Sequence, residues 1–186
     1  MKKAIKAFLK EIIPIVIGIL VALYINNWNE DRKDRNYIDR ISISMHKELT
    51  ETSNDITEKL AQQQMLVDSL NFYEKDDQIP LDQIIKKAKG IYIPSIKMNS
   101  WKAISSSKIE LMDYDKVSLL ADIQEQKELL QIKSEKLLDF IYANYREAKE
   151  EKKEFMKILI REIMSTETSL RNDIQKIIKK TNGAKN

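Results

Sequence analysis

An apolar run near the N-terminus constrains this chain more than any other feature of its sequence. Every residue from Ile12 to Ile25 is apolar or is Gly or Pro, and ten of them are Ile, Leu or Val. These ten residues favour insertion into a bilayer by about 3 to 6 kcal/mol in total. The 20 residues from Phe8 to Asn27 would form a helix about 30 Å long, which matches the thickness of a hydrocarbon core. The sequence therefore predicts one membrane-spanning helix, at residues 11–28.

A cleaved secretory signal is the main alternative interpretation of this run, because a lysine-rich stretch precedes it. Signal peptidases require small residues one and three positions before the cut. The exit from the run, Leu23-Tyr24-Ile25-Asn26-Asn27-Trp28, offers none. A helix lying on the membrane surface is disfavoured, because no charged face interrupts residues 12–25. We therefore expect an uncleaved signal anchor.

The basic residues that flank the run are nearly balanced between its two sides. Four lysines precede it, and four basic residues follow it closely: Arg32, Lys33, Arg35 and Arg40. The positive-inside rule compares the basic residues on the two sides of a span, and here the two counts are equal, so the rule by itself favours neither orientation. The free amino group and the basic lead favour a cytoplasmic N-terminus. We expect residues 1–10 in the cytoplasm and residues 30–186 in the periplasm or outside the cell.

The charge balance and composition limit the classes of protein that this chain can belong to. The 32 basic and 29 acidic side chains leave a net charge of +3, which is far from the strongly basic surface of a dedicated nucleic-acid binder. Only three Gly and three Pro occur, while helix-forming residues abound. The composition therefore predicts an all-α protein with long helices and no nucleic acid as partner.

A stripe of apolar residues after the span predicts a first long helix. The stripe extends from Ile38 to Leu70 in steps of three and four residues, the spacing of one helical face. This places the helix at residues 29–75, continuous with the span. The connection that follows, residues 76–112, should be partly extended and hold two short helices, at residues 81–89 and 101–107.

A second stripe predicts a second long helix. It begins near Asp113 and continues to the capping residues Ser165-Thr166, where we expect a bend before a last helix. We assign residues 113–180 to this region. Residues 181–186 are expected to form a disordered tail.

Two long amphipathic helices joined in this way most simply fold back on each other. The predicted fold is an N-terminal transmembrane helix that continues into a long helix, which pairs with the second long helix as an antiparallel hairpin or small bundle. The stripe around Ile56 and Leu60 should then face the stripe around Ile141 and Tyr145. Aromatic residues are expected to fill the shared core, namely Trp101, Phe140, Tyr142, Tyr145 and Phe155.

Small and polar residues recur along one face of the predicted span. Helical spacing brings together Glu11, Pro14, Gly18, Ala22 and Asn26. Small residues four apart let two helices approach closely, and an amide within the membrane seeks a partner. An acidic residue at the edge of a span also suggests a function. We expect this face to contact other transmembrane helices, from a second copy or from a subunit of a membrane complex. The alternative is that Gly and Pro are common in spans, while Glu11 and Asn26 simply reach the headgroups.

Two aromatic residues, Tyr24 and Trp28, lie at the outer end of the predicted span. Tyr and Trp are enriched at membrane–water interfaces, where their amphipathic rings lie at the level of the headgroups. We interpret both residues as interfacial anchors. The lipid bilayer is thus the first expected partner.

The span ends in a distinctive signature, Ile25-Asn26-Asn27-Trp28-Asn29-Glu30, preceded by Gly18-Ile19-Leu20 and Ala22. This GILxALxINNWNE-type segment resembles the start of a bacterial family of short single-span membrane proteins, catalogued as a domain of unknown function. Residues 101–111 resemble a later segment of that family. Tyr24 and Ser107 depart from its usual Gln and Gly. The resemblance implies a helical protein anchored in the bacterial inner membrane, and it implies no reaction.

Signs of catalysis in the sequence are weak. Ser105-Ser106-Ser107-Lys108 matches an S-x-x-K pattern, but the Ser-Asp-Asn element of such enzymes is missing. His46 is the only histidine and Cys is absent, which excludes the usual zinc sets and the Cys-His and Ser-His-Asp arrangements. The three glycines stand apart, so they form no phosphate-binding loop. We expect no enzyme activity, no metal and no cofactor.

These observations favour a non-enzymatic scaffold or accessory subunit of the membrane. Such a protein would associate through its transmembrane helix and present a periplasmic helical domain to partners. One alternative is a single-span ligand sensor, although residues 1–10 are too few for an output module. The other is an envelope-bridging, spanin-like protein, which predicts an open rod instead of a closed hairpin.

Overall fold

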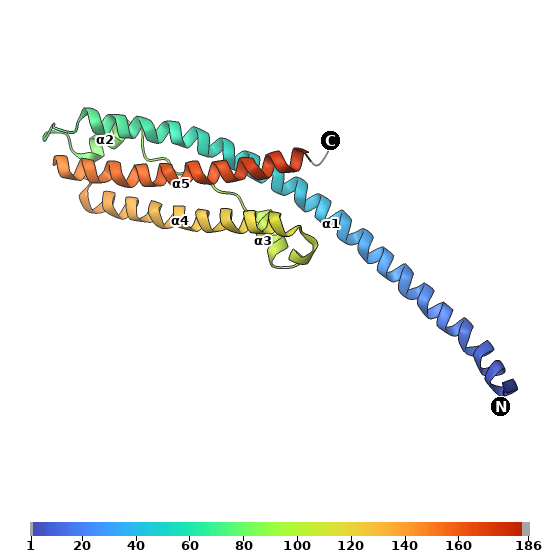
Figure 1. Cartoon of the computed structure of the whole chain (residues 1–186). Helices are drawn as coiled ribbons and strands as arrows, with labels where there is room; N and C mark the ends of the chain where they lie inside the picture. The colour runs from blue at the N-terminus through green and yellow to red at the C-terminus, as the bar shows by residue number, and fades with distance from the viewer. Residues whose placement is uncertain (1, 184–186) are drawn as a thin grey trace. The chain divides into compact units, whose positions relative to one another are not determined.

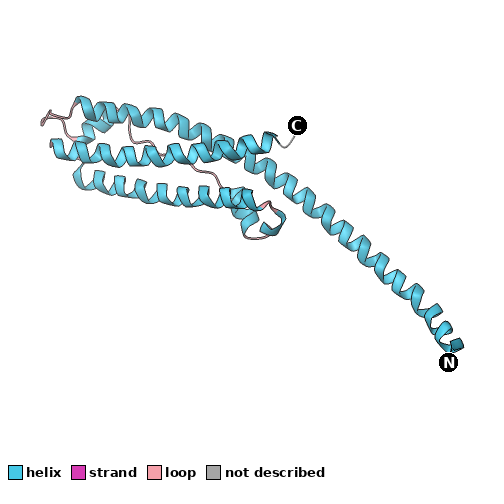
Figure 2. Ribbon diagram, viewed as in Figure 1, coloured by secondary structure: helices cyan, strands magenta, loops and turns pink. Residues whose placement is uncertain are grey.

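The computed structural model describes the backbone of residues 2–183 and the side chains of residue 10 and residues 12–180. The described chain is helical and contains no β-strand, which confirms the predicted all-α class. Its helices in chain order are α1 Lys2–Phe72, α2 Leu81–Lys87, α3 Asn99–Ser105, the 3-10 helix η1 Ile109–Leu111, α4 Tyr114–Asn144 and α5 Glu150–Gly183 (Figure 1, Figure 2).

The chain divides into two compact units, Met1–Ile43 and Ser44–Asn186. The described part of the first unit is the N-terminal portion of α1. The second unit contains the rest of α1 and all the later helices. The apolar run and the helical domain of the sequence therefore belong to different units.

α1 is a single helix of 71 residues, so the first long helix continues from the apolar run without a break, as predicted. Pro14 lies inside it. Its missing N–H leaves the Lys10 carbonyl without the usual helical donor, a defect that membrane helices tolerate. The helix ends at Phe72, where the Tyr73 carbonyl accepts a hydrogen bond from the Asp76 N–H (3.2 Å) in the following turn.

In the second unit, α1 and α5 lie side by side and antiparallel (Figure 1). The order of their contacts shows the direction. Gln63 of α1 bonds to Glu167 of α5, whereas Glu74, just beyond α1, bonds to Lys157, which comes earlier in α5. An antiparallel pairing of long helices is therefore present, and α5 is the antiparallel partner of α1.

α4 packs against the other side of α5, again antiparallel (Figure 1). Gln126 of α4 bonds to Asp173 of α5, and Lys133, further along α4, bonds to Thr166, which comes earlier in α5. Since α1 and α4 are both antiparallel to α5, they are parallel to each other. The three long helices of this unit form a small bundle.

The core of the bundle consists of apolar residues that recur every three or four positions along these helices. The buried ones are Met45, Leu49, Ile56, Leu66, Val67 and Leu70 of α1, Leu120, Ile123, Leu130, Leu137 and Ile141 of α4, and Met156, Ile160, Ile163, Leu170, Ile174 and Ile177 of α5. The α1 set confirms most of the first predicted stripe. Hydrophobic burial of these side chains is the main source of stability for this unit.

The connection between α1 and α4 is partly extended, as predicted. Residues 91–98, called the connecting segment from here on, have no helical structure and lie along α1. The Ser95 N–H donates to Asp55 Oδ2 (2.6 Å), and the Lys97 N–H donates to Thr52 Oγ1 (3.1 Å). Side chains of α1 thus provide acceptors for backbone N–H groups that would otherwise lack them.

The second helical region differs from the prediction, because it consists of two helices separated by a turn at residues 145–149. No Gly or Pro marks this turn. Its carbonyls accept hydrogen bonds from the start of α2, where the Leu81 N–H donates to Glu147 O (3.0 Å) and the Asp82 N–H donates to Tyr145 O (2.8 Å). These N–H groups have no partner within their own helix. A tertiary contact therefore stabilises the turn.

Two further predictions about this region are also wrong. Ser165-Thr166 lies inside α5 and marks no bend, because the chain has already turned before Glu150. α5 extends to Gly183, so the first three residues of the predicted disordered tail are helical. The other tail residues, 184–186, lie outside the described part of the chain.

The predicted register of the hairpin is also wrong. α4 is parallel to α1, so Ile141 and Tyr145 at its end lie toward the end of α1 at Phe72, and they do not face Ile56 and Leu60. The second apolar stripe predicts one long helix where the chain forms α4 and α5, so the antiparallel partner of α1 is α5 and not the segment that contains Ile141.

The aromatic residues were predicted to be buried, and only Trp101 is fully so. Tyr142, Tyr145 and Phe155 are exposed, and Phe140 is half-buried against Phe155 with ring centroids 5.1 Å apart. The turn before α5 changes which positions face the core. The aromatic residues on either side of it therefore lie outside the shared apolar stripe.

Candidate functional site

The first unit exposes a continuous apolar surface on α1. Every large apolar side chain between Ile12 and Ile25 is at least 36% exposed. An 18-residue stretch near the N-terminus has a mean hydropathy of 1.7, and none of it is buried. Within the described residues, α1 is thus the one helix long and apolar enough to cross a membrane.

All five residues of the predicted interaction face belong to α1. Each step of four residues rotates the position by about 40° around a helix, so Pro14, Gly18 and Ala22 share one face and Asn26 lies at its edge. These four residues are exposed, and a Cβ added at Gly18 would meet no atom within 4 Å. The side chain of Glu11 lies outside the described part. The helical backbone therefore places these residues on or near one face of α1, and the residues of that face whose side chains are described are exposed.

The two predicted interfacial anchors are exposed on the same helix. Tyr24 is 72% exposed and Trp28 is 52% exposed. The Arg32 guanidinium carbon lies 6.0 Å from the centre of the Trp28 ring, at the limit of a cation–π contact. A ring beside a cation is compatible with the headgroup region. The role of both residues as anchors stays a prediction.

The second unit buries a carboxyl group at the junction of three segments. Oε1 of the fully buried Glu167 accepts a hydrogen bond from Nε2 of Gln63 (2.8 Å), and the same amide nitrogen donates to the Tyr92 carbonyl (2.8 Å). Burial raises the pKa of Glu167 to about 7; the hydrogen bond from Gln63 opposes this rise, and the charge of Asp55 adds to it. Glu167 Oε2 and Gln63 Oε1 are buried without a hydrogen-bond partner among the described residues.

Two buried lysines stabilise the opposite end of α5. The ammonium group of Lys153 donates to the carbonyls of Tyr73 (2.9 Å) and Asp76 (2.7 Å), just after the end of α1. Lys157 forms an ion pair with Glu74 (2.7 Å), and its hydrogen bond lowers the pKa of that carboxyl. Both lysines thus stabilise the turn that follows α1.

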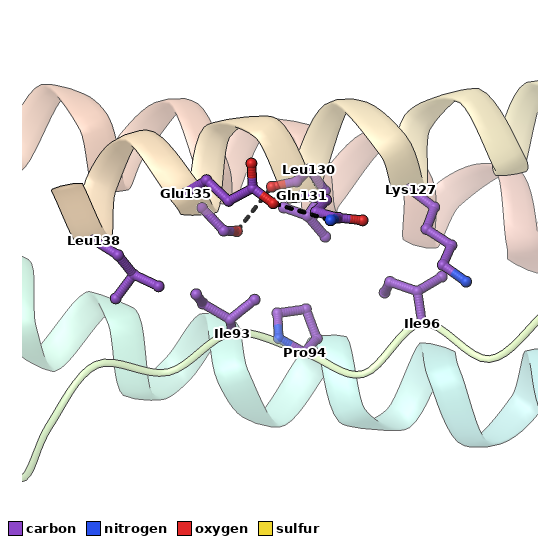
Figure 3. Close-up of a pocket in the computed structure, with 9 residues that line it drawn as sticks. Ile93, Pro94, Ile96, Lys127, Leu130, Gln131, Glu135 and Leu138 are labelled. Atoms are coloured by element: carbon purple, nitrogen blue, oxygen red, sulfur yellow. Dashed lines mark hydrogen bonds between the residues drawn. The ribbon is translucent and has the colours of Figure 1, made fainter.

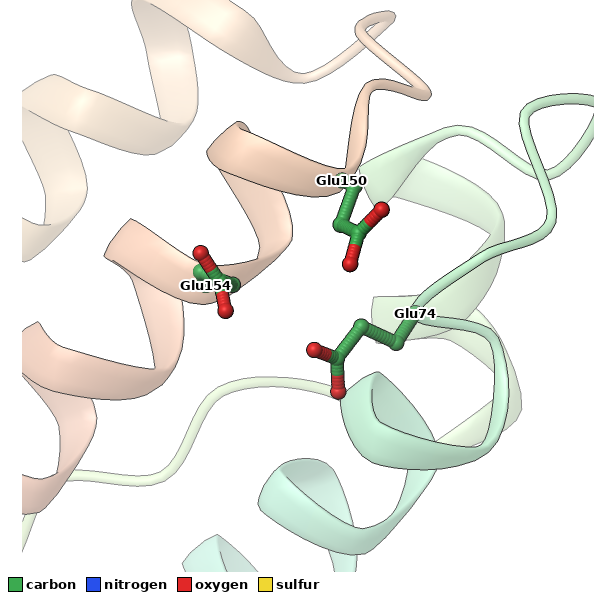
Figure 4. A group of neighbouring side chains, drawn as sticks. All are labelled: Glu74, Glu150 and Glu154. Carbon is green, nitrogen blue, oxygen red and sulfur yellow. The ribbon is translucent and has the colours of Figure 1, made fainter.

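Three carboxylates gather beside this turn, from Glu74, Glu150 and Glu154 (Figure 4). One oxygen of each lies within 4.8 Å of the others, a spacing that could accommodate a hard cation such as Ca²⁺. However, Lys157 already pairs with Glu74. Glu150 and Glu154 are exposed in the first turns of α5, where negative charge stabilises a helix. We therefore interpret this cluster as structural.

A hollow of about 220 Å³ lies between the connecting segment and α4 (Figure 3). Lys127 lies at one end of it and Leu138 at the other, and most of its lining is apolar, from Ile93, Pro94, Ile96, Leu130 and Leu138. A second hollow of about 440 Å³ also borders on Lys127. Its lining is more polar and includes Asn99, Trp101, Lys102, Ser105 and Gln124.

The three serines of the S-x-x-K segment donate hydrogen bonds to backbone carbonyls, as serines near the end of a helix commonly do. The hydroxyl groups of Ser105 and Ser106 donate to the Lys102 carbonyl (3.3 and 2.8 Å), and that of Ser107 donates to the Ala103 carbonyl (2.7 Å). All three thus satisfy carbonyl groups that the end of α3 leaves free.

Sequence reasoning missed the buried polar groups of α5. Lys153 lies three residues before the buried Met156, and Glu167 lies four residues after the buried Ile163, so both occupy the apolar face of the helix. That spacing was a usable signal, as was the position of Gln63 on the first apolar stripe. This signal can be recognised only when the first residue of α5 is known, because the turn before Glu150 determines which positions of α5 face the core.

Comparison with known proteins assigns this chain to no group. No family model matches it, no curated protein matches it, and no solved structure matches it. Its function must therefore be argued from its own residues and geometry.

Proposed function

We propose that this protein is a single-pass membrane protein whose α1 anchors a helical domain and associates with other transmembrane helices. Its N-terminus lies in the cytoplasm of a bacterium and its bundle lies in the periplasm. It acts as a non-enzymatic scaffold or accessory subunit. The resemblance of its INNWNE-type segment to a bacterial single-span family supports this assignment.

The observation that carries the proposal is the exposure of the apolar residues 12–25. Large continuous apolar surfaces are rare on soluble monomers and mark membrane or protein contacts. A helix also satisfies its own backbone hydrogen bonds, which a bilayer requires. The apolar stretch of α1 meets both conditions, since none of it is buried and it is helical throughout.

The closed bundle favours the scaffold over the envelope-bridging alternative. A bridging protein would need an extended rod, whereas α1, α4 and α5 bury their apolar stripes against one another within one unit. Such a bundle presents a rigid surface for partners. The orientation of the bundle rests on the basic residues that flank the apolar run.

The full-length protein is expected to stay in the membrane pellet after alkaline extraction and to retain its N-terminus. Combining Ile17→Lys with Leu20→Lys should release it, since each lysine costs about 2.5 to 3.5 kcal/mol at the centre of a span and the pair outweighs the 3 to 6 kcal/mol gained by the apolar residues. Fractionation and intact-mass measurement check both results.

The matched control combines Ile17→Leu with Leu20→Ile, which keeps the site apolar and should remain in the membrane. A wild-type chain released as a shortened soluble form that begins near Asn26 would contradict the anchor. Because the chain has no cysteine, Asn54→Cys also gives a single exposed label site in the bundle. Its labelling by an impermeant maleimide in intact spheroplasts would place the bundle outside the cytoplasm.

The interaction face is tested by adding bulk to it. Gly18→Leu and Ala22→Leu should weaken association with the partner span by about tenfold or more, because close approach of two backbones needs small residues. Val16→Leu, on the opposite side of the helix, should have no effect. Co-purification at matched expression in mild detergent measures the association.

Substitutions at the polar ends of the same face distinguish the effect of charge on association from the effect of size. Glu11→Gln should weaken association if a partner cation pairs with this carboxylate, while Asn26→Leu removes an amide contact worth about 0.6 to 2 kcal/mol. Equal co-purification of all variants would show that the face binds nothing, and the function would then reside in the bundle alone.

A further inference from the structure

The two hollows beside α4 adjoin at Lys127 and differ in chemical character. They share Lys127, and the larger one contains a second ammonium group, that of Lys102, together with the side-chain amides of Asn99 and Gln124. The smaller hollow is lined mainly by aliphatic side chains and leads away from Lys127 toward Leu138 (Figure 3). The site is thus cationic at one end and apolar at the other.

We propose that this site binds a single-chain amphiphile with an anionic head, of the class of a free fatty acid. The acyl chain lies between the connecting segment and α4, and the carboxylate lies between Lys102 and Lys127. This inference goes beyond the proposed membrane anchoring and does not depend on it, because every residue of the site belongs to the second unit.

The charged side chains of the site determine the charge of the ligand's head and the end of the site at which that head lies. Lys102 and Lys127 form no ion pair or hydrogen bond through their ammonium groups within the described chain, so both are available to a carboxylate. At the apolar end, Glu135 lies on the rim and accepts a hydrogen bond from Gln131 (2.9 Å) (Figure 3). A negative head is therefore favoured at Lys127 and disfavoured near Glu135.

The length of the site suits an acyl chain. From Lys127 to Leu138 the helix rises by roughly 16 Å at about 1.5 Å per residue. An extended chain advances roughly 1.2 Å per bond, by analogy with the extended backbone, so a chain of about a dozen carbons would span this distance. Ligand sites are typically mostly apolar with a few polar groups that orient the ligand, as here.

The hollow persists because the connecting segment is fixed to α1. Backbone N–H groups of Ser95 and Lys97 bond to side chains of α1, and the Tyr92 carbonyl bonds to Gln63. No hydrogen bond joins the described residues of the segment to α4. Only side chains meet across the gap, so an acyl chain can enter it without breaking a backbone contact.

The test uses the full chain in nanodiscs of phosphatidylcholine and a palmitate analogue that carries a diazirine on its chain. Photolysis should label peptides from residues 93–96 and 127–138, and mass spectrometry locates the label. Excess palmitate should remove the label, whereas excess palmityl alcohol, which lacks the charge, should remove it at about tenfold higher concentration.

Two kinds of variant test separately how the carboxylate head and the acyl chain of the ligand contribute to binding. Lys102→Gln combined with Lys127→Gln should reduce labelling by about tenfold, while Lys136→Gln, an exposed lysine elsewhere on α4, should leave it unchanged. Ser134→Leu, which fills the floor of the apolar hollow, should abolish labelling. Circular dichroism of each variant checks that the bundle is folded.

The proposal is overturned if the double lysine variant labels as well as the wild type, or if palmityl alcohol competes equally. It is also overturned if the label is found only on residues 12–28, which would reflect lipid around the anchor. Competition by anionic phospholipid nanodiscs as strong as that by palmitate would show a two-chain lipid in place of the free acid and would reject the proposal as well.

Discussion

Lys153→Met is expected to lower the free energy of unfolding of the bundle by about 2 to 4 kcal/mol. The buried ammonium group of Lys153 donates to the carbonyls of Tyr73 and Asp76, which lose this donor in the variant. A hydrogen bond to a charged group is worth about 1.5 to 3 kcal/mol. Each carbonyl keeps a backbone donor in the variant, the Asp76 N–H for Tyr73 and the Ile79 N–H for Asp76, and Asp76 is exposed, so the loss of the two bonds should cost less than their sum.

Methionine retains most of the aliphatic volume of lysine, so the loss should report hydrogen bonds and not a cavity. Unfolding by urea in mild detergent can be followed by the fluorescence of the buried Trp101 in a Trp28→Phe background, since the chain has only these two tryptophans. Lys136→Met, at an exposed position of α4, should change stability by less than about 0.5 kcal/mol. A Lys153→Met chain as stable as the wild type would show that water can replace the ammonium group at both carbonyls.

Glu167 should make the bundle less stable as the pH rises. Burial raises the pKa of this carboxyl from 4.5 to about 7, so the folded chain binds a proton that the unfolded chain releases between these values. The contribution of Glu167 to the free energy of unfolding should therefore be fully present below about pH 4.5 and fall by roughly 3 kcal/mol as the pH rises through 7. Above that pH the contribution of Glu167 no longer changes.

Glu167→Gln should remove this dependence, because an amide does not titrate, and should make the bundle more stable than the wild type at pH 8. The amide oxygen can still accept from Gln63, as the carboxylate does. Glu162→Gln, at an exposed position of the same helix, is the matched control and should keep the wild-type slope. Urea unfolding at pH 5 and pH 8 measures all three chains. An unchanged slope in Glu167→Gln would assign the pH dependence to other groups.

Local patterns predicted α1 well. The apolar run and the stripe from Ile38 to Leu70 each lie within one continuous segment, and a helix orders such residues by a period that depends only on the neighbouring chain. The interaction face could also be placed on α1 from its spacing. Whether a partner occupies that face depends on a second helix, about which spacing says nothing.

The candidate site of the second unit was not predictable in this way. Its walls come from the connecting segment and α4, which are separated in sequence by α3 and η1. The buried pair of Gln63 and Glu167 likewise joins helices that are far apart in the chain. A pattern within one segment gives no information about which other segment will lie beside it.

The sequence by itself determined the all-α class, the apolar run and the first long helix, because hydrophobicity and helical period are local properties. The tertiary structure alone decided where the second helical region turns. Residues 145–149 contain good helix formers and no Gly or Pro, so their local preference favours helix. They turn because the free N–H groups at the start of α2 need acceptors, and the carbonyls of Tyr145 and Glu147 supply them. That contact forms only when segments distant in the chain meet, and it fixes the phase with which α5 buries Lys153 and Glu167.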